Sequence, residues 1–394
     1  MGDRSRNSSE FAAEQLEWVI ELIKKIGEIP TPTGDEVRRA EEVRRKLRRL
    51  GFSTQYDRTG NLWTAWPPLK KLEAGGEPLA LFTSHLDCVF PWDIDWRVER
   101  NGNALRGPGV ADNTTGVAAL LALAKYVKET CPNPANQYVF AGTVGQVTDL
   151  RGIQALLDAI WATGLDPSKF CHVDVLGTPL GRVICGGVGT RRYEVRVSTT
   201  GGHSWLEAGA PNAIYEAARI IYKFYGTFRQ SKKKATYNVG TIRGGTSINA
   251  VAPSATFTCE FRWRDPRELR KFIRKARELI QEAERDPRVH VNLKYTGLRP
   301  ASPLRDDFPV VKLAQGVLRG LGVEPIVSFG SSDANYPLSV GLQSVALGCS
   351  KAHNTHTVNE WLEIDSLRVG LAQFFALFDD LERRFPLGRR KTEG

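Results

Sequence analysis

The spacing of apolar residues at the start of the chain predicts two amphipathic helices. The first covers residues 11–27, and Pro30 and Pro32 prevent it from continuing. The second covers residues 37–50 and is closed by Gly51. Apolar residues recur at helical spacing in both segments, which gives each predicted helix one face suited to burial. These residues are Leu16, Val19, Ile20, Ile23 and Ile26 in the first helix and Val37, Ala40, Val43, Leu47 and Leu50 in the second.

Further along the chain, short apolar runs alternate with helical patterns. The run 79–84 is apolar enough for a strand buried on both faces, and a glycine-punctuated turn at 107–116 leads into a helix over 117–127. Residues 138–144 form the next predicted strand. Strands that alternate with helices are typical of an α/β domain with a mainly parallel sheet flanked by helices.

The middle of the chain has a different pattern, in which apolar and polar residues alternate as they do in half-exposed strands. The predicted order is strand, helix, strand, strand, helix, strand, which is that of a ferredoxin-like α+β domain. Its elements are the strands 192–198, 237–243, 255–264 and 289–295 and the helices 212–228 and 265–283. Because the α/β pattern resumes after Pro303, we expect a discontinuous first domain of residues 1–187 and 301–394, with residues 188–300 inserted into it.

The composition is that of an ordinary globular protein. Hydrophobic residues make up 41% of the chain and charged residues 25%. No apolar run approaches the roughly 20 residues that cross a bilayer, and the first ten residues lack the apolar core of a secretory signal. The six cysteines include no C-x-x-C pair, which excludes a zinc ribbon and argues against a disulfide framework. We therefore expect a cytoplasmic protein with no membrane partner.

A formal net charge of +10 raises the question of nucleic-acid binding. The arginines fall largely on helices, and Glu41 and Glu42 lie four residues before Arg45 and Lys46 in one of them. Opposite charges at that spacing stabilise a solvent-facing helix surface. We expect this arginine-rich face to be solvated, and we predict no nucleic-acid partner.

Several polar residues stand where metal ligands or catalytic groups could lie, although each has a simpler interpretation by itself. His85 and Asp87 follow a buried strand and could be a surface hydrogen-bonded pair or a metal ligand with its orienting carboxylate. Asp112 could cap a helix, and His356 could be a plain surface residue. His203 follows two glycines, which allow a backbone to approach another group closely.

Taken together and in this order, these residues form a far more specific pattern. Over nearly its whole length the chain resembles the aminoacylase and glutamate carboxypeptidase family of two-zinc metallohydrolases, which includes succinyl-diaminopimelate desuccinylase and peptidase T. The segments that carry the resemblance are 29–36, 84–87, 109–113, 201–205, 247–253, 330–335 and 356–361.

The resemblance implies a role for each matching residue. His85 would bind one metal ion, Asp112 would bridge two, and His356 would bind the second. Asp87 would orient His85. His203 would reach in from the inserted domain of a partner subunit and stabilise the developing oxyanion. The inserted domain would therefore serve as a lid and as the interface of a homodimer.

The same resemblance implies residues that hold the substrate, a small molecule with a carboxylate or amide group. Asn249 and Arg299 would bind a substrate carboxylate. Asp333 and Asn335, from the matching segment 330–335, complete the expected set of substrate-binding positions.

The chain departs from the family at its catalytic positions. Family members carry two consecutive glutamates, a general base followed by a metal ligand, and here they align with Gln146 and Val147. A further acidic ligand aligns with Leu176. Asp174 lies two residues away on the same side of a predicted strand, and it could substitute if the backbone shifts.

These losses bear directly on the chemistry. A carboxamide cannot accept the proton of a metal-bound water, so Gln146 cannot act as the general base, whose contribution is typically about 10²–10⁴-fold. The second metal position keeps Asp112 and His356, fewer than the three protein ligands usual in a catalytic zinc site. The first hypothesis is therefore a non-catalytic relative with an eroded two-metal centre, which binds a small carboxylate or amide ligand.

The alternative is an active enzyme on N-acyl amino acids, dipeptides or related amides, with a single metal ion or an altered mechanism. His353 and Cys88 could each add a ligand that the family lacks, although a water-facing loop and a core position are their simpler interpretations. Both hypotheses are compatible with one weakly held divalent metal ion, with zinc as the expected metal, and both are compatible with no metal ion. Whether the chain is an enzyme is left open by the sequence.

Overall fold

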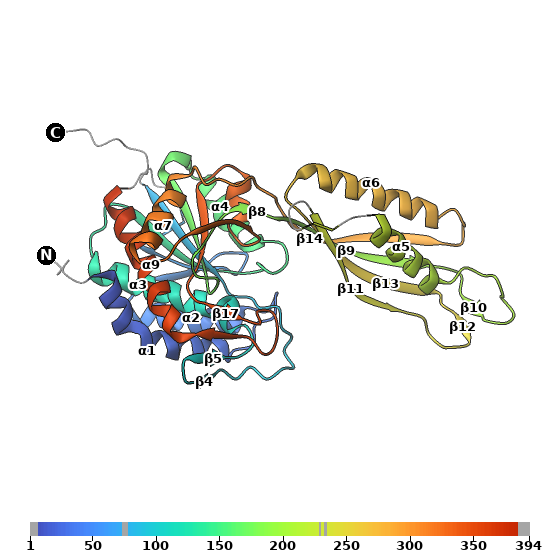
Figure 1. The fold of residues 1–394 in the computed structure, drawn as a ribbon, viewed down its shortest axis with the longest axis horizontal. Coiled ribbons are helices and arrows are strands. Elements are labelled where there is room, and N and C mark those ends of the chain that lie inside the picture. Colours follow the sequence, from blue (N-terminus) through green and yellow to red (C-terminus); the bar gives the residue numbers. More distant parts are fainter. Residues whose placement is uncertain (1–6, 73–77, 228–229, 232–234, 385–394) are drawn as a thin grey trace. The chain divides into compact units, whose positions relative to one another are not determined.

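The computed structural model describes residues 7–72, 78–227, 230–231 and 235–384, and the chain divides into two compact units (Figure 1). The main unit consists of Met1–Gly187 and Pro303–Gly394, and the inserted unit of Val188–Ser302. The inserted unit thus ends at residue 302, against the 300 predicted from the sequence. Among the described residues, no helix is long and apolar enough to cross a membrane.

Within the described residues, the main unit is built on an eight-stranded sheet with the order β1-β2-β6-β3-β7-β16-β8-β15. The pairs β3–β6, β3–β7, β7–β16 and β8–β15 are parallel, and the other three are antiparallel. The predicted α/β fold with a mainly parallel sheet is therefore confirmed. The strands are β1 Thr54–Tyr56, β2 Leu62–Trp66, β3 Leu79–His85, β6 Gln137–Thr143, β7 Phe170–Leu176, β8 Arg182–Gly187, β15 Ile326–Gly330 and β16 Ser344–Gly348.

Both faces of this sheet are buried. Successive side chains along a strand point to opposite faces, so each strand contributes to two cores. In β3, Ala80 and Phe82 belong to one apolar core, whereas Leu79 and Leu81 belong to another. Helices α1, α2, α3, α7 and α9 contribute to the first core and α4 to the second. The helices of this unit are α1 Ser8–Gly27, α2 Val37–Arg49, α3 Thr115–Thr130, α4 Arg151–Trp161, α7 Pro309–Gly320, α8 Asn335–Ser339 and α9 Ile364–Arg384.

Helix α2 buries a face that differs from the prediction. Val37 is exposed, whereas Arg39 is fully buried. The Arg39 guanidinium donates hydrogen bonds to the main-chain oxygens of Leu86 and Ile29, at 3.3 and 3.0 Å. Arg39 lies four residues before Val43 and so shares its buried face. The two main-chain oxygens accept hydrogen bonds from its terminal amino groups, whereas its Nε is buried without a hydrogen-bond partner among the described residues. The expectation of a solvated arginine face is therefore wrong for Arg39.

The inserted unit has the element order β9, α5, β11, β13, α6, β14, and its four-stranded antiparallel sheet has the order β11-β13-β9-β14. This is the ferredoxin-like arrangement predicted from the sequence. Residue 228, the last of one predicted helix, lies outside the described residues. The elements are β9 Gly189–Ser198, β10 Gly202–His203, α5 Ala213–Thr227, β11 Ala235–Gly244, β12 Ala250–Val251, β13 Ser254–Trp263, α6 Pro266–Ala283 and β14 His290–Arg299.

A second, smaller sheet of the main unit holds the loop that carries His356. Its antiparallel strands have the order β17-β18-β5-β4. The main-chain N–H of Gly107 donates to the main-chain oxygen of Glu360 at 3.0 Å, which joins the His356 loop to the segment that leads to Asp112. The strands are β4 Glu99–Asn101, β5 Ala104–Arg106, β17 Ala352–His353 and β18 Trp361–Glu363.

Candidate functional site

The candidate site begins where the parallel strands end. His85 is the last residue of β3, and it lies opposite Thr143, the last residue of β6. The loops after these strands carry Asp87 and Gln146. The carboxyl ends of parallel strands are the usual place for ligand sites in α/β sheets. Strand order alone therefore brings together residues that are far apart in the sequence.

His85 is buried between two carboxylates. Its Nδ1 lies 3.3 Å from Asp87 Oδ1 and 3.0 Å from the Asp87 main-chain oxygen, and its Nε2 lies 3.2 Å from Asp112 Oδ1. Burial alone would lower the pKa of His85, but the hydrogen bonds with Asp112 and Asp87 outweigh it and hold that pKa well above its ordinary value. Each ring nitrogen of His85 therefore lies within hydrogen-bond distance of one of the two aspartates.

Asp112 joins His85 to the second histidine. Its Oδ2 lies 2.7 Å from His356 Nε2. Desolvation would raise the pKa of Asp112, but hydrogen bonds with His356 and His85 hold it well below its ordinary value. The structure thus connects His85, Asp112 and His356 in this order, with the carboxylate between the two imidazoles. This connected set of three residues is called the central line below.

Glu360 holds this line in place, and the sequence reasoning did not single it out. Its Oε1 accepts hydrogen bonds from the N–H groups of Ala111 and Asp112, at 2.7 and 2.9 Å, and its Oε2 accepts from the N–H of His356 at 3.1 Å. Burial raises the pKa of Glu360 to about 7. The His356 backbone has a φ of 67°, a conformation that costs energy unless its surroundings enforce it. Because the partners of Glu360 are main-chain groups, the only sequence signal was its place in the matching segment 356–361.

The segment that aligns with the missing glutamates contacts Asp87 through its main chain. The N–H groups of Gln146 and Val147 donate to the Asp87 carboxylate at 3.2 and 2.9 Å, and the Thr33 hydroxyl donates at 2.9 Å. Burial would raise the pKa of Asp87, but its interaction with His85 lowers it. Asp87 therefore contacts His85 and ties three loops together, and its role in orienting His85 stays a prediction.

Two further candidate ligands are engaged elsewhere. His353 Nε2 lies 3.0 Å from Glu363 Oε1, and its ring stacks on Trp361 with centroids 4.1 Å apart. Cys88 is buried, its Sγ lies 3.7 Å from the Asp112 main-chain oxygen, and burial raises the pKa of its thiol to about 12. Cys88 is a core residue, as its simpler interpretation expected, whereas His353 is exposed but lies at the end of strand β17 and not in a loop.

Asp174 and Asp333 form a buried acidic pair beside the site. Asp174, on β7, accepts a hydrogen bond from the Thr83 hydroxyl at 3.3 Å, and Asp333 accepts one from the Thr143 hydroxyl at 2.5 Å. Burial raises the pKa of both, and the Asp174 charge adds to this effect at Asp333, whose pKa is about 8. Among the described residues, Asp174 shares no hydrogen bond with His85 or Asp112. Its role as a substitute ligand stays a prediction.

Asp333→Asn is expected to flatten the pH dependence of stability. A folded-state pKa of about 8 exceeds the unfolded value of about 3.9, so protonated Asp333 stabilises the fold at low pH. That contribution falls as the pH rises toward 8, by at most about 1.4 kcal/mol per pH unit. Urea unfolding at pH 5 and pH 8 measures it. Asp306→Asn, at an exposed aspartate, should keep the wild-type slope, and equal slopes for both variants would contradict the assignment.

The remaining predicted residues lie in different surroundings. His203 is exposed on β10, and its Nδ1 accepts the N–H of Trp205 at 3.2 Å. Asn249 accepts the Ser247 hydroxyl at 2.6 Å, and Arg299 is buried at the end of β14. These three belong to the inserted unit. Asn335, in the main unit, is buried and accepts the N–H of Ser332 at 3.1 Å. Their catalytic and substrate-binding roles, and that of Asp333, stay predictions.

The donor set can be compared with what a two-metal centre requires. His85 and Asp112 would face one metal position, and Asp112 and His356 the other. In the part of the chain that the structure describes, no group of three or more His, Cys, Asp or Glu side chains is placed to hold a metal ion. Catalytic zinc sites usually have three protein ligands. His85, Asp112 and His356 would thus offer two side chains to each metal position, with Asp112 shared between the two.

Known proteins share both the sequence pattern and the fold. Succinyl-diaminopimelate desuccinylase of Bordetella parapertussis is 23% identical over 369 residues, which cover 89% of this chain and 94% of that protein. An uncharacterized Bacillus subtilis protein, YqjE, is 24% identical over 374 residues with the same two coverages, 89% and 94%. The crystal structure of a tripeptidase from Staphylococcus aureus has the same fold, with a TM-score of 0.74 at 22% identity over 93% of this chain and 99% of that one.

A model of a whole protein family also matches the chain. A model of peptidase family M20/M25/M40 matches residues 81–380, which is more than half of the chain. The matched range includes both histidines and the aspartate of the central line, and it includes the inserted unit. The resemblance noted from the sequence is confirmed, and the chain belongs to peptidase family M20/M25/M40.

Proposed function

We propose that this chain is a family member whose metal centre is incomplete, and that it binds a small ligand with a carboxylate or amide group without two-zinc amide hydrolysis. The observation that carries the proposal concerns the main-chain contacts and the side chains of Gln146 and Val147. Their N–H groups donate to Asp87, and neither side chain is a carboxylate. The position of the general base therefore holds a carboxamide, which cannot take a proton from water.

The retained residues support a binding role. The His356 side chain is 60% exposed and can present its imidazole to a ligand, while Asp112 and Glu360 fix its position. Hydrogen bonds with His356 and His85 hold the pKa of the Asp112 carboxyl below its ordinary value. An exposed imidazole on a fixed support suits a carboxylate or an amide carbonyl.

His356→Ala is expected to weaken ligand binding about tenfold, the loss of one charge-assisted hydrogen bond. Isothermal titration with N-acetyl amino acids and dipeptides would measure the affinity, and amino-acid release would measure hydrolysis. His290→Ala, at an exposed histidine of the inserted unit, is the matched control. The proposal expects binding without turnover. Turnover by the wild-type protein that His356→Ala abolishes would contradict it.

A second candidate function is amide hydrolysis with one metal ion. The observation that favours it is the position of Asp112, whose two oxygens face His85 and His356 at 3.2 and 2.7 Å. These are three donors of kinds that bind zinc. Zinc-dependent turnover of N-acyl amino acids, with about one ion retained per chain, would favour this candidate over the first.

We also propose that the chain forms a homodimer through the inserted unit. Strand β11 lies at the edge of its sheet, and Tyr215 and Tyr222 on α5 are 65% and 79% exposed. An open strand edge and large exposed aromatic residues are typical of interaction surfaces. Tyr222→Glu is expected to shift the mass measured by light scattering from dimer to monomer. Val340→Glu, at an exposed apolar residue of the main unit, should not, and a monomeric wild-type protein would refute the proposal.

A further inference from the structure

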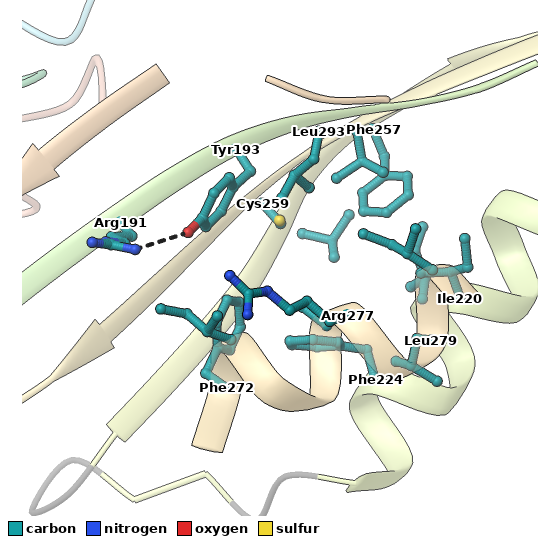
Figure 2. Close-up of a pocket in the computed structure, with 16 residues that line it drawn as sticks. Arg191, Tyr193, Ile220, Phe224, Phe257, Cys259, Phe272, Arg277, Leu279 and Leu293 are labelled. Atoms are coloured by element: carbon teal, nitrogen blue, oxygen red, sulfur yellow. Dashed lines mark hydrogen bonds between the residues drawn. The ribbon is translucent and has the colours of Figure 1, made fainter. Parts of the chain in front are cut away.

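The inserted unit contains a cavity between its sheet and the helices α5 and α6, with a volume of about 220 Å³ (Figure 2). All of its lining residues lie within Val188–Ser302, so the cavity is separate from the candidate site of the main unit. None of the residues given a catalytic, metal-binding or substrate-binding role lines it. The site already described therefore does not explain this cavity.

Most of the lining is apolar. Alternate residues of the strands point to the same face of the sheet, and in this way Val195 on β9 and Phe257 on β13 reach the cavity. Phe224 on α5 and Leu279 on α6 close it from the other side. An unfilled apolar space forfeits the dispersion contacts that its walls would otherwise make. An apolar group of suitable size would restore these contacts.

Two guanidinium groups give the cavity a polar end. Figure 2 shows Arg191 beside Tyr193, and Arg277 extending from α6 toward the same end, with Ile220 and Leu279 away from it. Arg191 donates to the Tyr193 hydroxyl at 3.5 Å, and its Nε is buried without a hydrogen-bond partner among the described residues. Both Arg191 and Arg277 line the cavity.

Some arginines of the inserted unit pair with carboxylates, whereas these two do not pair with any carboxylate that the structure describes. Arg192 pairs with Glu260 at 2.8 Å, and Arg219 pairs with Glu216 at 2.6 Å. In the described part of the chain, neither Arg191 nor Arg277 forms a salt bridge with a carboxylate. A pair of cations that lacks an acidic partner at the edge of an apolar cavity is complementary to an anion with an apolar tail.

We propose that this cavity binds a small amphipathic monocarboxylate, with its carboxylate at Arg191 and Arg277 and its tail between the sheet and the two helices. The size is adequate, because an engineered apolar cavity of about 150 Å³ holds benzene. A compact tail of one aromatic ring with a short alkyl chain fits this volume, whereas a dicarboxylate would bury a charge without a partner.

The test uses the full chain and 4-phenylbutyrate as the probe. In isothermal titration, 4-phenylbutyrate is expected to bind at least about tenfold more tightly than the uncharged 4-phenylbutan-1-ol or the tail-less acetate. Arg277→Ala should weaken 4-phenylbutyrate about tenfold. Arg274→Ala should leave the affinity unchanged, because Arg274 is exposed on the same helix, as Arg277 is, but does not line the cavity.

Isoleucine methyl NMR locates the bound probe and does not depend on any variant folding. Saturating 4-phenylbutyrate should shift the methyl signals of Ile220 and Ile280, which line the cavity, and leave those of Ile23 and Ile153 in the main unit unchanged. Unshifted Ile220 and Ile280 signals would overturn the proposal. So would affinity that survives Arg277→Ala but is lost in His356→Ala, since the probe would then occupy the main-unit site.

Discussion

Asp87→Ala is expected to lower the free energy of unfolding by about 3–5 kcal/mol, the cost typical of removing one partner of a buried ion pair. Asp87 is fully buried and accepts hydrogen bonds from Gln146, Val147 and Thr33. Without the carboxylate, these donors lose their acceptor, and the buried His85 loses one of its two anionic partners. Both effects destabilise the folded state in the same direction.

A second buried cation increases the expected effect. Arg39 is fully buried, and the negative charge of Asp87 supports its positive charge. Because the folded-state pKa of Asp87 lies below its ordinary value, the stabilisation is present above about pH 4 and is lost as the pH falls further. The difference in the free energy of unfolding between the wild type and Asp87→Ala should therefore become smaller at acidic pH.

Urea unfolding at pH 7 measures this loss. Asp87→Asn should have an intermediate stability, because the amide oxygen can still accept hydrogen bonds but carries no charge. Asp95→Ala is the matched control, since Asp95 is exposed and pairs only with exposed Arg97. If Asp87→Ala lost no more stability than Asp95→Ala, the buried carboxylate would not be the anchor inferred from the structure.

The double variant Gln146→Glu/Val147→Glu is expected to gain zinc and activity together. It restores the two carboxylates that the family resemblance implies, and a general base is typically worth about 10²–10⁴-fold in rate. Gln146 is buried and close to Asp87, so added negative charge should destabilise the metal-free protein. Zinc should reverse that loss, because a ligand that binds the folded state stabilises it.

Three measurements test this expectation. They are elemental mass spectrometry after dialysis against zinc, thermal unfolding with and without EDTA, and the release of amino acid from N-acetyl amino acids. The control is Val147→Gln, which places two neighbouring carboxamides where the variant has two carboxylates. The wild type is expected to retain fewer than about two ions per chain, and the double variant to retain more. A wild-type protein with about two tightly held ions and full hydrolysis would show an intact centre and refute the proposed function.

The pattern of residues along the chain is sufficient to predict the two-domain organisation, the mainly parallel sheet and most of the candidate residues. These features depend on local patterns: apolar runs for buried strands, helical spacing for α1 and α2, and alternation in the inserted unit. Local patterns also have limits. The pattern does not predict helix α4, although Ile153, Leu156, Leu157 and Ile160 give it a buried face, because the helix begins inside the glycine-containing stretch 142–152.

The tertiary structure alone decided which polar groups meet. Asp112 and His356 are separated by 244 positions along the chain, yet Asp112 Oδ2 lies 2.7 Å from His356 Nε2. Glu360 joins their two loops through main-chain N–H groups, which every residue except proline carries and no sequence pattern marks. The pairing of Asp174 with Asp333 and the burial of Arg39 likewise depend on neighbours from distant strands and loops. Periodicity reports which face of an element is buried, whereas the partners of a buried charge are set by how the elements pack.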